Sequence, residues 1–78
     1  MYLSDAKAGK EYEVVKVEGP KFLKRRIMDM GILPGVKIKV VRVAPLGDPM
    51  DIIVKGYNLS IRKNEASIVV VKEVVLET

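Results

Sequence analysis

The feature that most constrains the fold is the large share of β-branched aliphatic residues. Valine and isoleucine together account for 20 of the 78 residues, whereas the chain has only four aromatic residues. β-Branched side chains are stiff at χ1 and pack well on the pleated surface of a sheet. We therefore expect a mostly β chain with an aliphatic core, and its short length favours a single domain over residues 1–78.

Glycine and proline divide the chain into short segments. The expected elements are a helical turn or loop at 4–9, strands at 11–18, 36–43, 50–55, 59–62 and 67–76, a helix at 21–30, a turn at 56–58, and a tight connection at 63–66 that we expect to be a 3₁₀ turn. Many short strands with close turns favour a small barrel or sandwich. In so short a chain we expect a mainly β fold: a small five-stranded SH3-like barrel with one short α-helix between the first two strands.

The helix and the strand after it carry clear local signals. Leu23, Ile27 and Met30 fall at i, i+4 and i+7 and form one apolar stripe, which Phe22 is expected to extend at its edge. The turn at 33–35 has proline second and glycine third, as a type II turn requires. The alternation of apolar and basic residues slips just after residue 40, which predicts a β-bulge there.

The composition excludes several kinds of chemistry. The chain has neither cysteine nor histidine, which removes disulfides, thiol nucleophiles and the commonest general base and metal ligand. The serines lack a partner base, and no Gly-rich phosphate loop is present. We therefore expect no enzyme activity, no cofactor and no iron site made of protein ligands alone. The longest apolar run has four residues, 68–71, and we see no signal peptide, so the cytoplasm is the expected compartment.

Charge is unevenly placed along the chain. Residues 20–63 carry a net charge of +7, whereas residues 1–19 carry −1 and residues 64–78 carry −2. This asymmetry is compatible with a polyanionic or acidic protein partner. A plain lysine-rich solvated surface explains it equally well.

Four blocks of residues resemble the ferrous-iron transport protein A (FeoA) family in order and spacing. The blocks are MGILPG at 30–35, APLGDP at 44–49, GYNLSIR at 56–62 and EA at 65–66. The resemblance runs from Ser4 to Val71. It departs from the family at Met30, where the family usually has leucine, and at Ile61, where the family often has leucine. It implies an SH3-like barrel in the bacterial or archaeal cytoplasm that supports ferrous iron uptake by a large membrane permease with a cytosolic GTP-binding domain. It also implies association with a transition metal ion, and the same module occurs fused to iron-dependent repressors.

Two basic rows are candidate partner-binding surfaces. The first lies on the helix at Lys21, Lys24 and Arg25, with Arg26 beside them, and the second on the outward face of the second strand at Lys37, Lys39 and Arg42. Charges at the rim of an interface mainly set association rate and specificity. A solvated face remains the alternative for both rows, because charge runs are usual on exposed helix surfaces.

The turns supply the remaining candidate contacts. Leu46 and Tyr57 are apolar residues in expected turns, where they serve either as interface anchors or as caps on the barrel end. Asp48 is a candidate contact too, but we favour a role in hydrogen bonding to the backbone of its turn. Arg62 and Glu65 are expected to pair across the tight connection.

Three functions compete at this point. The favoured one is an accessory protein that contacts the cytosolic GTPase part of the ferrous iron permease, and so meets the membrane only indirectly. The second is a module that acts with an iron-dependent repressor. The third is a basic nucleic-acid-binding barrel; we expect no nucleic acid, because only Tyr57 is expected to be free for base stacking.

The last expected strand is apolar on both of its faces. Val69 and Val71 lie on one face, and Ile68 and Val70 lie on the other. An exposed apolar edge invites pairing between chains. We therefore expect a weak homo-oligomer that forms through this strand.

Overall fold

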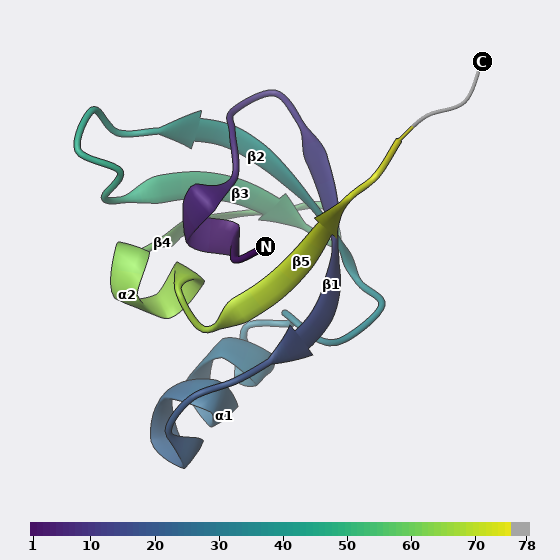
Figure 1. The fold of residues 1–78 in the computed structure, drawn as a ribbon, viewed down its shortest axis with the longest axis vertical. Helices are drawn as coiled ribbons and strands as arrows, with labels where there is room; N and C mark the ends of the chain where they lie inside the picture. The colour runs from purple at the N-terminus through teal and green to yellow at the C-terminus, as the bar shows by residue number, and fades with distance from the viewer. Residues whose placement is uncertain (76–78) are drawn as a thin grey trace.

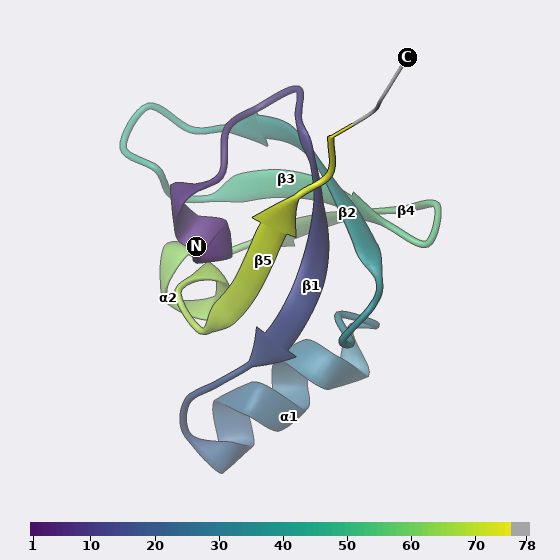
Figure 2. The same ribbon diagram turned by 45° about the vertical axis from the view of Figure 1, so that its right-hand side comes forward.

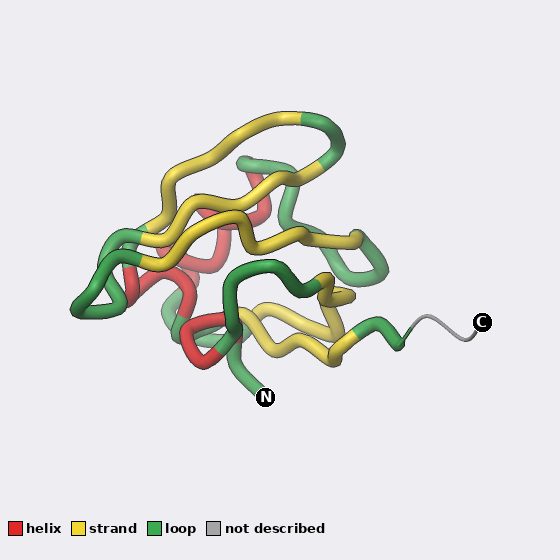
Figure 3. The backbone as a smooth tube through the Cα atoms, turned by 90° about the horizontal axis from the view of Figure 1, so that it is seen from above, coloured by secondary structure: helices red, strands yellow, loops and turns green. Residues whose placement is uncertain are grey.

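Five antiparallel strands form one sheet in the computed structural model, which describes residues 1–75 (Figure 1). The strands are β1 (Glu11–Val17), β2 (Lys37–Val43), β3 (Met50–Val54), β4 (Tyr57–Ile61) and β5 (Val69–Glu73), in the order β4-β3-β2-β1-β5. The sheet curls around the core, as the view from above shows (Figure 3). A 3₁₀ helix, η1 (Leu3–Asp5), precedes β1, α1 (Lys21–Asp29) joins β1 to β2, and α2 (Lys63–Ala66) joins β4 to β5. The expected five-stranded barrel with a helix between its first two strands is confirmed.

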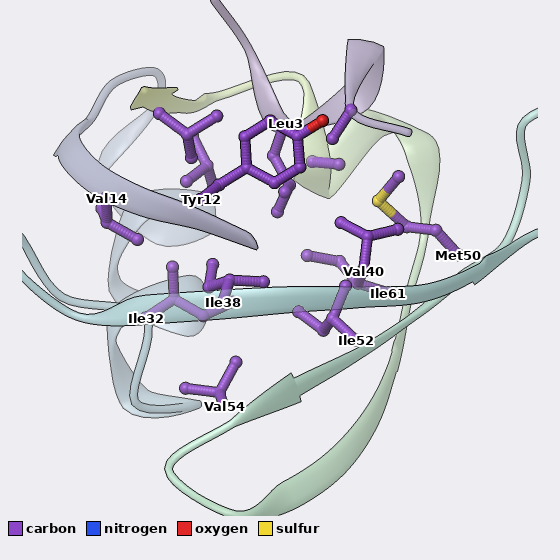
Figure 4. Packing of buried hydrophobic residues seen from close by; sticks show 14 of the residues in the cluster. Leu3, Tyr12, Val14, Ile32, Ile38, Val40, Met50, Ile52, Val54 and Ile61 are labelled. Atoms are coloured by element: carbon purple, nitrogen blue, oxygen red, sulfur yellow. The ribbon is translucent and has the colours of Figure 1, made fainter. Parts of the chain in front are cut away.

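The core is made almost entirely of aliphatic side chains (Figure 4). On β3 every second residue is buried, which is the pattern of a strand with one face on the core. Of the four aromatic residues, Tyr12 alone is buried, and its hydroxyl oxygen accepts a hydrogen bond from the Lys7 N–H at 3.0 Å. Phe22 is 76% exposed, so the expectation that it extends the apolar stripe of α1 is wrong. It lies five residues before the buried Ile27, which places it about 140° away around the helix.

Two bulges bend the sheet. The register between β2 and β3 shifts between Val40 and Arg42, so Val41 is the extra residue and is 48% exposed. The bulge predicted near Val40 is therefore confirmed. A second shift, between Val14 and Lys16 in the pairing of β1 with β5, was not predicted. Bulges increase local twist and help a small sheet to close.

One predicted turn is confirmed and one is displaced. The Val36 N–H donates to the Leu33 carbonyl at 3.0 Å and Gly35 has a φ of 89°, as the predicted type II turn requires. The turn expected at 56–58 is instead the pair Lys55 and Gly56, with φ values of 50° and 82°. Two consecutive residues with positive φ form a tight hairpin, so β4 already begins at Tyr57.

The C-terminal part of the sheet differs from expectation. The tight connection at 63–66 is one turn of α-helix, and β5 begins at Val69 rather than at residue 67. The expected end of this strand, residue 76, lies outside the described residues. The outer edge of β5 is also not free: the Val71 N–H donates to the Met1 carbonyl at 2.8 Å, and Tyr2 bridges Val70. The exposed edge on which the weak homo-oligomer was predicted is therefore covered, and self-association itself remains a prediction.

Within residues 1–75, none of the helices is both long and apolar enough to cross a membrane.

Candidate partner-binding surfaces

The α1 surface, which we define as Lys21, Phe22, Lys24 and Arg25, is exposed at one end of the barrel (Figure 2). The three cations, with Met28 and Asp29, line an open hollow of about 460 Å³ next to the helix. Within the described part of the chain, none of the three cations forms an ion pair. The structure therefore brings the predicted basic row together, and Phe22, which was expected at the edge of the apolar stripe, is exposed on the same helix.

The helix is held to the barrel by Ile27 and Arg26. Ile27 is fully buried, and the Arg26 Nε lies 3.3 Å from Glu65 Oε2 on α2. The other oxygen of Glu65 accepts the Arg62 N–H at 2.9 Å, at the start of α2. The expected pairing of Arg62 with Glu65 thus runs through the Arg62 backbone, and the ionic partner is Arg26 instead. These contacts fix how α1 presents its exposed cations.

The second predicted row, on β2, has a more mixed environment. Lys37, Lys39 and Arg42 are all exposed, as predicted. However, the register of β1 against β2 places Glu13 opposite Lys37 and Glu11 opposite Lys39. The Arg42 Nε in turn lies 3.5 Å from Asp51 Oδ2. Carboxylates directly across from the cations reduce the positive potential of this face, so α1 is the stronger candidate for an acidic partner.

The loop between β2 and β3 holds two further predicted contacts. Leu46 is 88% exposed at this loop, and Asp48 Oδ1 accepts the Lys63 N–H at 3.2 Å. Asp48 therefore accepts a backbone hydrogen bond, as favoured from the sequence, but from the first turn of α2 and not from its own turn. Its role in binding a partner remains a prediction, as does that of Leu46.

Tyr57 lies far from that loop. It is 73% exposed, next to the turn between β3 and β4. Because β3 runs from the loop to this turn, its five residues separate Tyr57 from Leu46 by roughly 15 Å or more. The nine predicted contact residues thus occupy four separate regions: α1, the outer face of β2, and each of the two ends of β3.

One exposed group of titratable side chains helps to hold the N-terminal segment. The Tyr2 hydroxyl donates to Glu18 Oε2 at 3.0 Å, and the Lys16 Nζ lies 3.0 Å from Glu18 Oε1. Hydrogen bonds from Lys16 and Tyr2 lower the pKa of the Glu18 carboxyl, and the bond to Glu18 raises the pKa of Tyr2. The group links the segment that covers β5 to the end of β1.

Over residues 1–75, no three histidine, cysteine or acidic side chains converge in a way that could hold a metal ion. The absence of an iron site made of protein ligands remains a prediction.

Comparison with known proteins identifies the family. Residues 1–73 match the FeoA domain. The chain is 39% identical over 67 residues to an Fe(2+) transport protein A/Fe(2+) transporter FeoB fusion protein of Porphyromonas gingivalis. That match covers 86% of this chain but only 8% of the fusion protein, so the chain spans a small part of that relative's length.

Solved structures agree with this match. A FeoA-like protein from Clostridium acetobutylicum is 32% identical, with a TM-score of 0.90, over 100% of this chain and 91% of that one. The zinc-complexed FeoA of Stenotrophomonas maltophilia, an SH3 domain protein, is 26% identical, with a TM-score of 0.80, over 92% of this chain and 89% of that one. The chain therefore belongs to the FeoA domain family of SH3-like, non-enzymatic accessory domains associated with ferrous iron transport.

Proposed function

We propose that this protein assists ferrous iron uptake in the cytoplasm by binding the cytosolic GTPase part of the ferrous iron permease. The observation that carries the proposal is the relative in which the same domain is fused to the transporter FeoB. Fusion keeps two domains at high local concentration, which is useful when they act on one another. Where the two domains are not joined, the same association must form through their surfaces.

The α1 surface is the contact that we favour. Exposed aromatic side chains are common anchors at the centre of interfaces, and Phe22 is 76% exposed. Arg25, three residues further along, is its neighbour on the helix surface, and Lys21 is a neighbour of both Arg25 and Lys24. This positive charge would steer an acidic partner and set its orientation. The outer face of β2 supports the proposal less, because its cations lie across from carboxylates.

Co-purification with the cognate permease tests the proposal directly. The protein is immobilised and exposed to the full-length permease and to its soluble GTPase domain, each with GDP or a GTP analogue. Retention of either form in at least one nucleotide state is the expected result. Failure of both forms to bind under all conditions would refute the proposed function.

Single substitutions then test the surface. Phe22→Ala and Lys24→Glu should each weaken binding by about tenfold or more, as expected for an anchor and for a steering charge. Lys7→Glu is the matched control, because Lys7 is exposed on another part of the molecule and the change in net charge is the same. An equal loss in the Lys24 and Lys7 variants would show that net charge matters and that the α1 surface does not.

A further inference from the structure

The outer edges of the two edge strands, β5 and β4, differ in whether they are paired with another segment. The outer edge of β5 is covered by Met1 and Tyr2, through the hydrogen bond to Val71 and the bridge to Val70. The outer edge of β4 has no strand partner within residues 1–75, where β4 pairs with β3 alone. An unpaired edge strand presents backbone donors and acceptors that can pair with another chain.

The outward groups on this edge belong to Asn58 and Ser60. Across a two-residue turn, the flanking residues Val54 and Tyr57 form a hydrogen-bonded pair, and the pattern then alternates along the strand. Tyr57, Leu59 and Ile61 therefore bond to β3, while the N–H and C=O groups of the two residues between them point away from it. β4 contains neither a charged residue nor a proline, although such residues usually protect an exposed edge.

A hollow next to β4 offers side-chain contacts to a ligand. It has a volume of about 350 Å³ and reaches from β4 across β3 to β2, where it is lined by Val41, Asp51, Asn58, Leu59 and Ser60. Leu59 is half-buried and Val41, the bulge residue, is 48% exposed. Strand addition takes affinity from main-chain hydrogen bonds and specificity from such contacts with alternate side chains.

Charge decides between the possible occupants. Exposed cations flank both ends of the neutral strand, Lys55 at one end and Arg62 and Lys63 at the other. If β4 paired antiparallel with β4 of a second copy, Lys55 would approach Arg62 and Lys63 of that copy at both ends, and like charges across strands are unfavourable. The nearest carboxylates are engaged, Asp51 with Arg42 and Asp48 with the Lys63 N–H.

We infer that the free edge of β4 binds an extended segment of a partner protein, uncharged in its centre and acidic at both ends, as a sixth strand of the sheet. The acidic ends would lie against Lys55 and against Arg62 and Lys63, and the centre would bond to Asn58 and Ser60. This site is separate from the α1 surface and does not depend on the permease.

The test uses the intact protein and a free peptide. The probe is a nine-residue peptide with alternating threonine and valine in the centre and two glutamates at each end, and the control peptide has lysines in place of the glutamates. In ¹⁵N NMR titrations, the glutamate peptide should shift the amide signals of Asn58 and Ser60 and slow their hydrogen exchange. The lysine peptide should bind at least tenfold more weakly.

A matched pair of variants tests the backbone contact. Ser60→Pro removes an outward N–H and should weaken peptide binding by about tenfold, whereas Ser60→Ala keeps it and should bind normally. If the proline variant does not fold, N-methylation of alternate peptide amides provides the same test on the unaltered protein. Methylation of the amides that face β4 should abolish binding, and methylation of the amides that face away from it should not. Three results would each overturn the inference: equal binding of both peptides, shifts of amide signals confined to α1, or shifts at β4 that depend on protein concentration in the absence of peptide. The last result would assign the edge to a second copy.

Discussion

Glu65 offers the sharpest test of how the two helices are held. Its side chain is only 8% exposed, and its two oxygens have different partners. One accepts the Arg62 N–H at 2.9 Å at the start of α2, and the other lies 3.3 Å from the Arg26 Nε on α1. Glu65→Ala removes both contacts, whereas Glu65→Gln keeps an oxygen for the Arg62 N–H and removes the charge.

The structure sets the relative size of the two losses. The alanine variant leaves the Arg62 N–H without its acceptor, which costs about 1 kcal/mol, and removes buried methylene groups worth about 1 kcal/mol more. The ion pair adds about 0.5 kcal/mol, because the Arg26 side chain is 69% exposed and therefore well screened by solvent. We expect Glu65→Ala to lower the free energy of unfolding by about 2–3 kcal/mol, and Glu65→Gln by about 0.5–1 kcal/mol.

Urea denaturation followed by circular dichroism measures both values. A domain of this size has a total stability of roughly 4–12 kcal/mol, so the alanine variant should show a clearly lower midpoint with an unchanged slope. A double-mutant cycle with Arg26→Ala should give a coupling energy below about 1 kcal/mol. Equal losses in the alanine and glutamine variants would refute the reasoning, because the charge and not the hydrogen bond to the Arg62 backbone would then dominate.

Three further predictions concern other parts of the barrel. The pKa of Glu18 is lowered and that of Tyr2 is raised, so their contact stabilises the fold between about pH 4 and pH 10. This stabilisation is lost as the pH falls through the Glu18 pKa or rises through the Tyr2 pKa. Tyr2→Phe should therefore reduce the pH dependence of thermal unfolding at both limits. Leu3→Ala should cost about 2–4 kcal/mol in urea denaturation, because this fully buried side chain fixes the segment over β5, and a loss below about 1 kcal/mol would show that the segment is not part of the core. Val40→Ala should cost about 2 kcal/mol and Val41→Ala less than about 0.5 kcal/mol, and the reverse order would place the bulge elsewhere.

Features that depend on local sequence were predictable. Four of the five strands follow from runs of β-branched residues, and the turn at Gly35 follows from a proline and glycine pair with one favourable geometry. The hairpin turn at Lys55 was missed because lysine seldom adopts positive φ and gives no turn signal. Phe22 was expected to extend the edge of the apolar stripe because its ring is apolar, but its angular position on the helix turns it away from the core.

Features that depend on pairing between distant segments were not predictable. Nothing in the last strand indicates that Met1 covers its edge, because that contact joins residues 70 positions apart. The glutamates opposite Lys37 and Lys39 likewise depend on the register of β1, which alternation alone leaves undetermined. The exposure of each candidate contact could be predicted, but their division into separate surfaces could not.

The two proposed binding regions meet at α2. Arg62 and Lys63, whose charges flank the free edge of β4, are also the first residues of the segment that carries Glu65. Glu65 in turn holds Arg26, on the helix whose exposed side is proposed to bind the permease. Occupancy of the β4 edge and the orientation of α1 are therefore linked through Arg62, whose charge would lie against the ligand's acidic end and whose N–H is accepted by the buried Glu65 carboxylate. The fold thus connects a backbone-recognising edge to a charged helix through a single side chain, and Glu65→Gln, which keeps the hydrogen bond and breaks the ion pair, is the substitution that separates them.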